Sequence, residues 1–340
     1  MEAASVAWHH LGWTPVGFSE IDPFPCAILK HRFPNTPNYG SLTEYASWPL
    51  GPGSIDLLVG GTPCQSFSVA GLRRGLADPR GNLALVFLGL ADKLKPKWII
   101  WENVPGVLSS NGGRDFGSFL GALVELGYGF AYRILDAQYV GGPRAVPQRR
   151  RRVFVVACLG GWEASAAALS LRQGLSGNPS PGRKKRKEAS DVAHVGAYQG
   201  VYENRPTDGR ITGPHPVCPT MTSRFGTGGG NVPLVHHVGE SRGIPNCEVS
   251  GTLRANPGSG WRSDGTPVEP VVVDCGEIRR LTARECERLQ GFPDDWSMIP
   301  WKGKPASECP DAPRLKACGN SMAVPVMRFI GENIHNLTQK

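Results

Sequence analysis

Residues 55–64 read Ile-Asp-Leu-Leu-Val-Gly-Gly-Thr-Pro-Cys, an apolar run that opens through two glycines into a proline and a cysteine. Such a run is typical of a buried strand giving way to a loop, and open α/β sheets bind ligands at that carboxyl edge. Pro63 fixes its own φ and restricts Thr62, so Cys64 is presented on a stiff backbone. The pattern predicts a nucleophile there, although a lone cysteine is more commonly a small buried apolar residue.

Two later strands adjoin polar residues that we expect at the same edge of the sheet. The apolar run 97–101 is followed by Glu102, so a carboxylate also stands where a strand ends. Four arginines, 149–152, precede a further apolar run, and period-two alternation turns Arg150 and Arg152 to one side. A structural carboxylate and a solvated basic edge would explain each feature alone. Thiol, carboxyl and guanidinium together indicate an active site.

These segments and two later ones resemble, in order, the motifs of the DNA (cytosine-5) methyltransferases. The likeness extends through the first 158 residues and the last 62. The matching motifs are Pro63-Cys64-Gln65, Glu102-Asn103-Val104, Gln148 with Arg150 and Arg152, residues 280–293 and residues 319–325. Five matches in the family's order indicate membership far more strongly than one. The resemblance implies an α/β fold: a doubly wound, Rossmann-like, S-adenosylmethionine-dependent methyltransferase domain with a smaller, irregular target recognition domain.

The resemblance also implies the chemistry, which is methyl transfer from S-adenosyl-L-methionine to C5 of a cytosine in double-stranded DNA. Cytosine C5 is a weak nucleophile until a thiolate adds to C6, the role implied for Cys64. Glu102 would hydrogen-bond N3 and the exocyclic amine, and Arg150 would bind O2 and lower the pKa of the thiol. The target atoms lie inside the base stack, so base flipping is implied, at a cost on the order of a few kcal/mol.

For the cofactor, the resemblance assigns Glu20 to the ribose hydroxyls and Ile21 to packing on adenine. Ser41 stands where many relatives carry the aspartate that holds the adenine amine. The other matching cofactor positions are Gly61, Pro63, Asn320 and Ser321. The family's Phe-x-Gly-x-Gly loop has no match before Glu2, so we expect a sheet without its central strand and weakened cofactor binding.

The resemblance, together with a break in the strand–helix pattern between about 160 and 278, implies three parts. We expect a catalytic and cofactor-binding domain over 1–158, a target recognition domain over 159–278, and a returning segment over 279–340 that completes the catalytic domain. The basic run 183–187 is interpreted as a flexible linker, with a phosphate clamp or a nuclear-localisation-like sequence as alternatives. The candidate DNA contacts are Gln65, Arg152, Arg224, Arg254 and Arg262.

Local signals predict individual elements within a mostly parallel sheet. A strand is expected over 14–19, and helices over 2–11, after Asn82, over 116–126, from the Thr282/Glu285 capping box to Gly291, and over 321–337.

The whole-chain numbers fit a protein that binds DNA inside a cell. A net charge of +8 favours a polyanionic partner. Nine cysteines without a Cys-x-x-Cys pair indicate reduced thiols and a cytoplasmic location. Nothing in the sequence predicts a membrane span or a zinc site. With the family resemblance, we expect a nucleoid-associated monomer in a prokaryotic host, with a cognate restriction endonuclease as a candidate partner.

Two other functions stay open on the sequence. One is methylation of cytosine in RNA, which the long middle segment disfavours because the resemblance places a DNA-reading domain there. The other is a truncated homologue that binds DNA without turnover.

Overall fold

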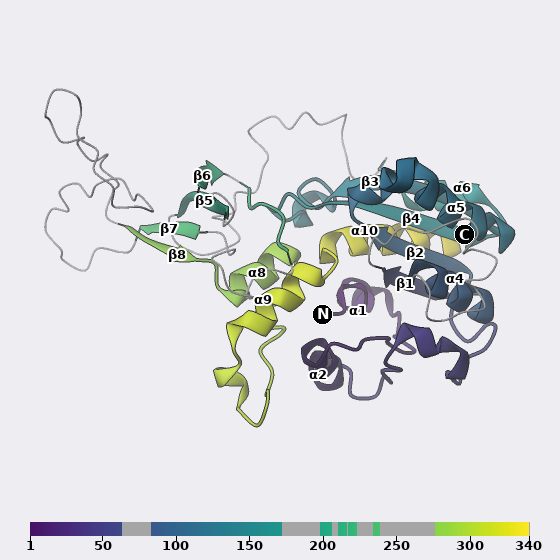
Figure 1. The fold of residues 1–340 in the computed structure, drawn as a ribbon, viewed down its shortest axis with the longest axis horizontal. Helices are drawn as coiled ribbons and strands as arrows, with labels where there is room; N and C mark the ends of the chain where they lie inside the picture. The colour runs from purple at the N-terminus through teal and green to yellow at the C-terminus, as the bar shows by residue number, and fades with distance from the viewer. Residues whose placement is uncertain are drawn as a thin grey trace, which may run out of the picture.

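The computed structural model describes residues 1–62, 83–171, 198–205, 210–215, 217–222, 234–238 and 276–339. These residues form an α/β body and a small antiparallel sheet that projects from it (Figure 1). The basic run 183–187 lies outside the described residues. In the described part, no helix is long and apolar enough to cross a bilayer.

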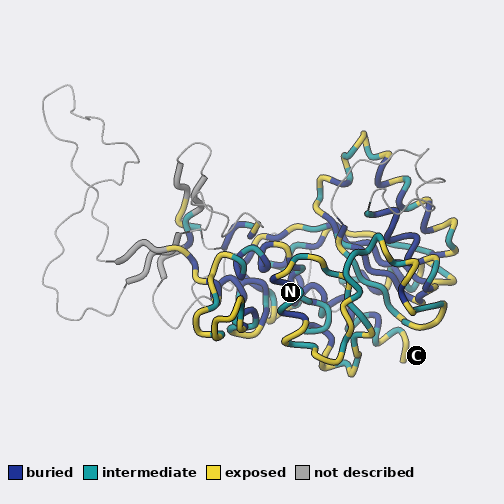
Figure 2. Tube along the Cα trace, turned by 60° about the horizontal axis from the view of Figure 1, so that its bottom comes forward, coloured by how far each residue is buried: buried dark blue, intermediate teal, exposed yellow. Residues whose placement is uncertain are grey.

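The elements of the body are eight helices and four strands among the described residues. The helices are α1 (Ala3–Trp8), α2 (Pro23–Arg32), α4 (Leu83–Leu94), α5 (Arg114–Glu125), α6 (Trp162–Ala168), α8 (Ala283–Gln290), α9 (Asp311–Asn320) and α10 (Val324–Thr338). The strands are β1 (Leu57–Gly61), β2 (Trp98–Asn103), β3 (Tyr128–Asp136) and β4 (Arg151–Leu159). Burial is concentrated along these strands and the helices that cover them (Figure 2).

The sheet of the body has the strand order β1-β2-β4-β3. β1 and β2 run parallel, whereas β4 is antiparallel to both β2 and β3. The α/β, Rossmann-like class is confirmed, but the sheet is mixed rather than mostly parallel. Parallel strands need a crossover helix, and the connection from β3 to β4 holds only the short 3₁₀ helix Gly142–Arg144.

The strand expected over 14–19 is wrong in this structure. Its backbone makes a single bridge, from Phe18 to Asn38, and does not join the sheet. Among the described residues, β1 is the edge of the sheet and no strand lies on its free side. Residues 14–19 therefore lack a neighbouring strand with which to form a ladder.

The predicted helices are confirmed, with small changes at their ends. α8 begins at a capping box formed by Thr282 and Glu285, and it ends at Gly291, whose φ of 81° is left-handed. α10 begins at Val324 rather than Ser321 because Ser321 is extended, with φ −75° and ψ 153°. Pro325 is accommodated in the first turn, where no backbone N–H is required.

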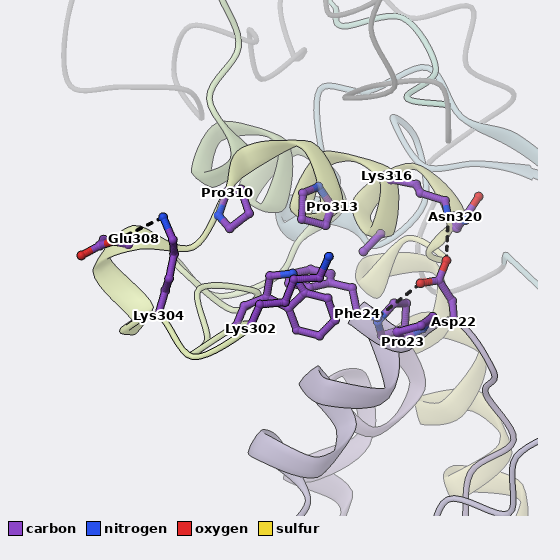
Figure 3. A pocket seen from close by; sticks show the side chains of 13 residues that line it. Asp22, Pro23, Phe24, Lys302, Lys304, Glu308, Pro310, Pro313, Lys316 and Asn320 are labelled. Carbon is purple, nitrogen blue, oxygen red and sulfur yellow. Dashed lines mark hydrogen bonds and ion pairs between the residues drawn. The ribbon is translucent and has the colours of Figure 1, made fainter.

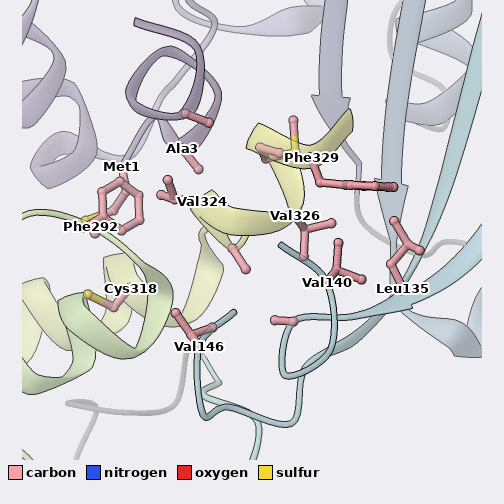
Figure 4. Packing of buried hydrophobic residues seen from close by; sticks show 14 of the residues in the cluster. Met1, Ala3, Leu135, Val140, Val146, Phe292, Cys318, Val324, Val326 and Phe329 are labelled. Carbon is pink, nitrogen blue, oxygen red and sulfur yellow. The ribbon is translucent and has the colours of Figure 1, made fainter. Parts of the chain in front are cut away.

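The last helix packs into the body formed by the first part of the chain. Trp8 Nε1 donates a hydrogen bond of 2.7 Å to Met327 O. Gly331 permits this approach, because a Cβ built there would lie 2.0 Å from Trp8 Nε1. The buried cluster around this contact includes Ala3, Leu135, Val140, Val324, Val326 and Phe329 (Figure 4). Residues from both ends of the chain thus share one core.

The described residues in the middle of the chain form a second sheet. Its strands are β5 (Tyr198–Arg205), β6 (Arg210–His215), β7 (Leu234–Val238) and β8 (Gly276–Arg280). Their order in the sheet is β6-β5-β7-β8. β8 crosses the predicted boundary at 278, and α6, which follows the predicted boundary at 158, packs on β3 and β4 of the body. The three-part division stays a prediction.

Candidate active site

Glu102 lies near the carboxyl end of β2, in register with Gly61 of β1. Its Oε1 is 3.1 Å from Arg152 Nε, and the two side chains are only 13% and 15% exposed. A Cβ added at Gly61 would lie 3.2 Å from Glu102 Oε2 and 3.3 Å from Met322 Cε. The glycine therefore leaves room beside the carboxylate, at the edge of the sheet where the sequence placed the reactive groups.

Burial raises the pKa of Glu102, and the positive charges of Arg150 and Arg152 oppose that shift. Desolvation disfavours the ionised carboxylate more than the two guanidinium groups stabilise it. The carboxyl group therefore keeps a proton to higher pH than an exposed glutamate would.

Arg150 is 3% exposed and engages backbone carbonyls rather than a carboxylate. Its Nη1 donates to Met221 O at 2.9 Å, and its Nη2 donates to Gly319 O at 3.2 Å and to Ser321 O at 2.6 Å. Burial, and then repulsion from Arg152, lowers the pKa of Arg150 to about 10. The guanidinium in direct contact with Glu102 belongs to Arg152, which the sequence analysis had placed only among the DNA contacts.

The residue before Pro63 is held by two side chains of β2. Trp101 Nε1 donates to Thr62 Oγ1 at 2.9 Å, and Asn103 Nδ2 donates to Thr62 O at 3.0 Å. Asn103 Oδ1 in turn accepts from Val104 N at 2.8 Å. Asn103 stands in the Glu102-Asn103-Val104 motif but was predicted to have no role, and no role was predicted for Trp101. A buried amide directly after Glu102 was the available signal.

Several predicted site residues lie outside the described residues. They are Pro63, Cys64, Gln65, Arg224, Arg254 and Arg262. Their roles stay predictions.

The two residues predicted to hold the nucleoside part of the cofactor adjoin the start of α2. Glu20 Oε1 accepts from Ile21 N at 2.8 Å and from Asp22 N at 2.9 Å, while no described residue donates to Oε2. Ile21 is 71% exposed, an unusual position for a large apolar side chain. A carboxylate oxygen left for hydroxyl groups and an apolar surface left for a base fit a nucleoside.

The serine predicted at the adenine amine, Ser41, is already engaged locally. Its hydroxyl accepts from Thr43 N at 3.3 Å and lies 2.7 Å from Thr43 Oγ1. It caps the 3₁₀ helix Leu42–Ser47. The local bonds leave this side chain less suited to an adenine contact than an aspartate would be.

Asn320 is the last residue of α9, and Ser321 is its C-cap. Asn320 lines an open cavity of about 550 Å³ between α2 and α9 (Figure 3). There Lys316 Nζ binds Asp22 Oδ2 at 2.6 Å, which ties the start of α2 to α9. Glu20 and Ile21, just before α2, therefore lie close to the end of α9 that carries Asn320, and the free carboxylate oxygen and exposed apolar side chain fit a nucleoside, whereas Ser41 fits it less well.

Comparison with known proteins gives a consistent family match. Residues 1–336 match the family model for C-5 cytosine-specific DNA methylases. A protein of Escherichia phage P1 named DNA N-6-adenine-methyltransferase is 35% identical over 460 residues, which cover 98% of this chain and 60% of that protein. The type II methyltransferase M2.BsuMI of Bacillus subtilis (strain 168) is 31% identical over 335 residues, covering 96% of this chain and 71% of that protein. This chain therefore spans less than two thirds of the phage protein.

The fold also matches a solved structure. That of the S. pombe Dnmt2 methyltransferase superposes with a TM-score of 0.61 and covers 99% of this chain and 96% of that one. The identity is 16%, so this likeness concerns the fold alone.

Proposed function

This chain belongs to the C-5 cytosine-specific DNA methylase family, and on that premise we propose that it methylates flipped-out cytosine in duplex DNA through a transient covalent bond to Cys64. S-adenosyl-L-methionine is the methyl donor of the reaction. The single observation that carries the proposal is the Glu102–Arg152 pair, held next to Gly61 at the carboxyl edge of β1 and β2.

Each group has a defined part in the proposed reaction. The thiolate of Cys64 adds to cytosine C6, and the electron pair of the C5–C6 double bond becomes available at C5. C5 then takes the methyl group as the bond from that methyl to the sulfonium sulfur breaks, which leaves S-adenosylhomocysteine. Protonated Glu102 donates to N3 and so offsets the charge that develops on the ring. Removal of the C5 proton then restores the double bond as the C6–S bond breaks.

We assign the guanidinium that binds cytosine O2 to Arg152 instead of Arg150. Arg152 contacts the carboxylate that would bind N3, and O2 and N3 are neighbours on one edge of the ring. Both terminal nitrogens of Arg150 already donate to carbonyls, so it has less to offer a base. A fixed cation at O2 stabilises negative charge on the ring and favours the thiolate of a nearby cysteine.

The two clamps on Thr62 support the placement of the nucleophile. Because Trp101 and Asn103 hold both the hydroxyl and the carbonyl of Thr62, the chain enters Pro63 from a fixed point beside Glu102. A nucleophile must be held near its target for an efficient attack, and an anchored backbone provides part of that positioning.

The name of the phage P1 relative raises methylation of the adenine amino group as another activity. That reaction needs neither a thiol adding to a ring carbon nor a proton donor at a pyrimidine N3. A carboxyl whose pKa is raised by burial, next to a guanidinium, fits the pyrimidine reaction. The whole-chain family match favours the same activity.

Covalent trapping tests the proposal. The protein is incubated with S-adenosylmethionine and a long mixed-sequence duplex in which 5-fluorocytosine replaces cytosine. Fluorine cannot leave as a proton does, so we expect a protein–DNA adduct stable to denaturing electrophoresis.

Matched cysteine variants make the trapping specific. Cys64→Ser should abolish the adduct while DNA binding persists, and Cys309→Ser should retain it, because the thiol of half-buried Cys309 bonds only to Ser297 O among the described residues. An adduct that survives Cys64→Ser would refute the nucleophile assignment. DNA binding without an adduct would favour the binding-only homologue, and competition by transfer RNA but not by duplex DNA would favour an RNA substrate.

The proposal extends to partners. A monomer acting on cytoplasmic DNA, together with a cognate endonuclease, would fit the type II relatives. Bisulfite sequencing of DNA from expressing cells would give the target sequence, and sedimentation would give the oligomeric state.

A further inference from the structure

Four segments meet at three buried side chains, Gln148, Arg150 and Gln290, which we call the buried polar junction. Their exposed fractions are 0%, 3% and 0%. Gln148 Nε2 donates to Leu289 O at 3.3 Å, and Gln290 Nε2 donates to Cys318 O at 2.8 Å. Because these acceptors are backbone carbonyls, the junction fixes the path of the chain at the end of α8 and at the end of α9.

Arg150 joins two of these segments through one guanidinium. Nη1 binds Met221 O, in the segment 217–222, whereas Nη2 binds Gly319 O and Ser321 O. The segment 217–222 is attached to the residues just before Arg150 and β4 by the bonds Arg149 N to Cys218 O and Cys218 N to Pro147 O, of 2.9 and 2.8 Å. The two segments that Arg150 joins are otherwise far apart in the sequence.

We propose that Arg150 is a positioning residue that couples DNA binding to cofactor binding. The inference rests on the proposed function. Segment 217–222 belongs to the middle part of the chain predicted to read DNA, and the other bonded segment carries Asn320 and Ser321, predicted to face the cofactor. A ligand that shifts either segment changes the bonds of the same guanidinium. Such a coupling is reciprocal, so each ligand changes the affinity of the other by one factor.

The requirement for two distant acceptors explains why a cation is buried here. No carboxylate of the described residues forms an ion pair with Arg150, and burying a charge without such a partner is costly. The planar guanidinium presents donors in a fixed fork that spans both segments, which the single ammonium of a lysine does not. Arg150 Nε finds no partner in the described part of the chain, so the bonding capacity of the side chain is not exhausted.

The test measures binding and needs no methyl transfer. The dissociation constant of S-adenosylhomocysteine is measured by calorimetry without DNA and with a saturating, unmethylated, mixed-sequence duplex. For the unaltered protein we expect DNA to change that constant by about 5-fold or more, within the usual range of coupled sites. In Arg150→Lys and Arg150→Met, the ratio of the dissociation constants measured without and with DNA should be near one.

The matched control is Arg133→Met, which removes another arginine-to-carbonyl hydrogen bond, of 3.2 Å to Leu169 O, outside the junction. It should keep the ratio of the unaltered protein. A purely structural role for Arg150 would weaken both affinities and lower Tm yet leave the ratio unchanged, and that result overturns the inference. A ratio of one in the unaltered protein, or no measurable cofactor binding, overturns it as well.

The two proposals fail in distinguishable ways. If Arg150→Met does not fold, Arg150→Lys decides, since it keeps the charge and most of the volume. If the unaltered protein forms an adduct with 5-fluorocytosine DNA but the Arg150 variants keep its ratio of dissociation constants, the methylation mechanism stands and the coupling role falls. If the Arg150 variants lose the effect of DNA on the S-adenosylhomocysteine dissociation constant but the unaltered protein forms no adduct, the coupling role stands and the methylation mechanism falls.

Discussion

Two glutamate–arginine pairs of nearly equal length lie in different regions of the molecule. Glu102 and Arg152 are 3.1 Å apart at the edge of the central sheet, and Glu287 and Arg314 are 3.2 Å apart between α8 and α9. The first pair is 13% and 15% exposed, whereas Glu287 is fully buried and Arg314 is 5% exposed. Length alone does not distinguish them, but their remaining bonds do.

The carboxylate of Glu287 has both oxygens occupied. Oε1 accepts from Ser297 N at 2.9 Å, and Oε2 accepts from Trp296 N at 3.2 Å. Glu102 Oε2, by contrast, accepts from none of the residues that the structure describes. A fully bonded carboxylate holds chain segments together, while one with an unused oxygen and a raised pKa can serve a substrate.

The largest effect on activity is expected from Glu102→Gln. The amide cannot give a proton to N3, so kcat should fall by about 10²–10⁴, the usual contribution of a general acid. Tm should change little, because the fold already disfavours the charge of Glu102. Methyl transfer to DNA and thermal unfolding, measured on one preparation, check both parts. A large fall in Tm would show that this pair is structural like the other.

The opposite outcome is expected for Glu287→Gln. Loss of this charge leaves Arg314 with its more exposed partners Asp295 and Asp311, at 3.4 and 3.3 Å, so the free energy of unfolding should fall by about 1–3 kcal/mol. Tm and the denaturant midpoint should fall, while kcat per folded molecule at low temperature stays near normal. Loss of kcat in fully folded protein would contradict the contrast between the two regions.

Arg152→Met should change the pH profile as well as the rate. Arg152 lowers the pKa of Glu102, so its removal raises that pKa further. The protonated carboxyl then persists to higher pH, and the alkaline limb of kcat/KM should move upward in pH while the maximum falls about 10²-fold. A limb that moves to lower pH, or stays in place, would show that Glu102 does not act as the proton donor.

Gly61→Ala should have a smaller effect. The new Cβ would lie 3.2 Å from Glu102 Oε2 and 3.3 Å from Met322 Cε, so the neighbouring side chains must shift by a few tenths of an ångström. A displaced catalytic group should cost about tenfold in kcat/KM. The control is Gly106→Ala, in the 3₁₀ helix Pro105–Leu108 after β2, where nothing lies within 4 Å of the added carbon. Equal activity of the two variants would count against a close fit at Gly61.

The elements with strong local signals could be predicted from the sequence. The capping box at Thr282, the left-handed Gly291 and the apolar run that becomes β1 follow from backbone preferences and periodicity. The strand over 14–19 was wrong because a strand needs a neighbour, and that neighbour depends on the rest of the sheet. The same limit applies to β4, which runs antiparallel to β3 after a connection that holds no crossover α-helix.

The site was predicted in part for a related reason. Order and residue type located Glu102 and the arginine run, since such motifs are local. They could not say which arginine would contact the carboxylate, because alternation places Arg150 and Arg152 on one side equally. Only the carbonyls of Met221, Gly319 and Ser321, brought from distant segments, separate the two roles.

The hydrogen bond from Trp8 to Met327 has a consequence for synthesis. The first helix reaches its final partner only after α10 has left the ribosome, so the nascent chain holds an apolar surface without its cover for most of translation. If translation stops before Val324, that apolar surface stays exposed. The truncated product should then be bound by chaperones or degraded rather than accumulate as a partly active enzyme.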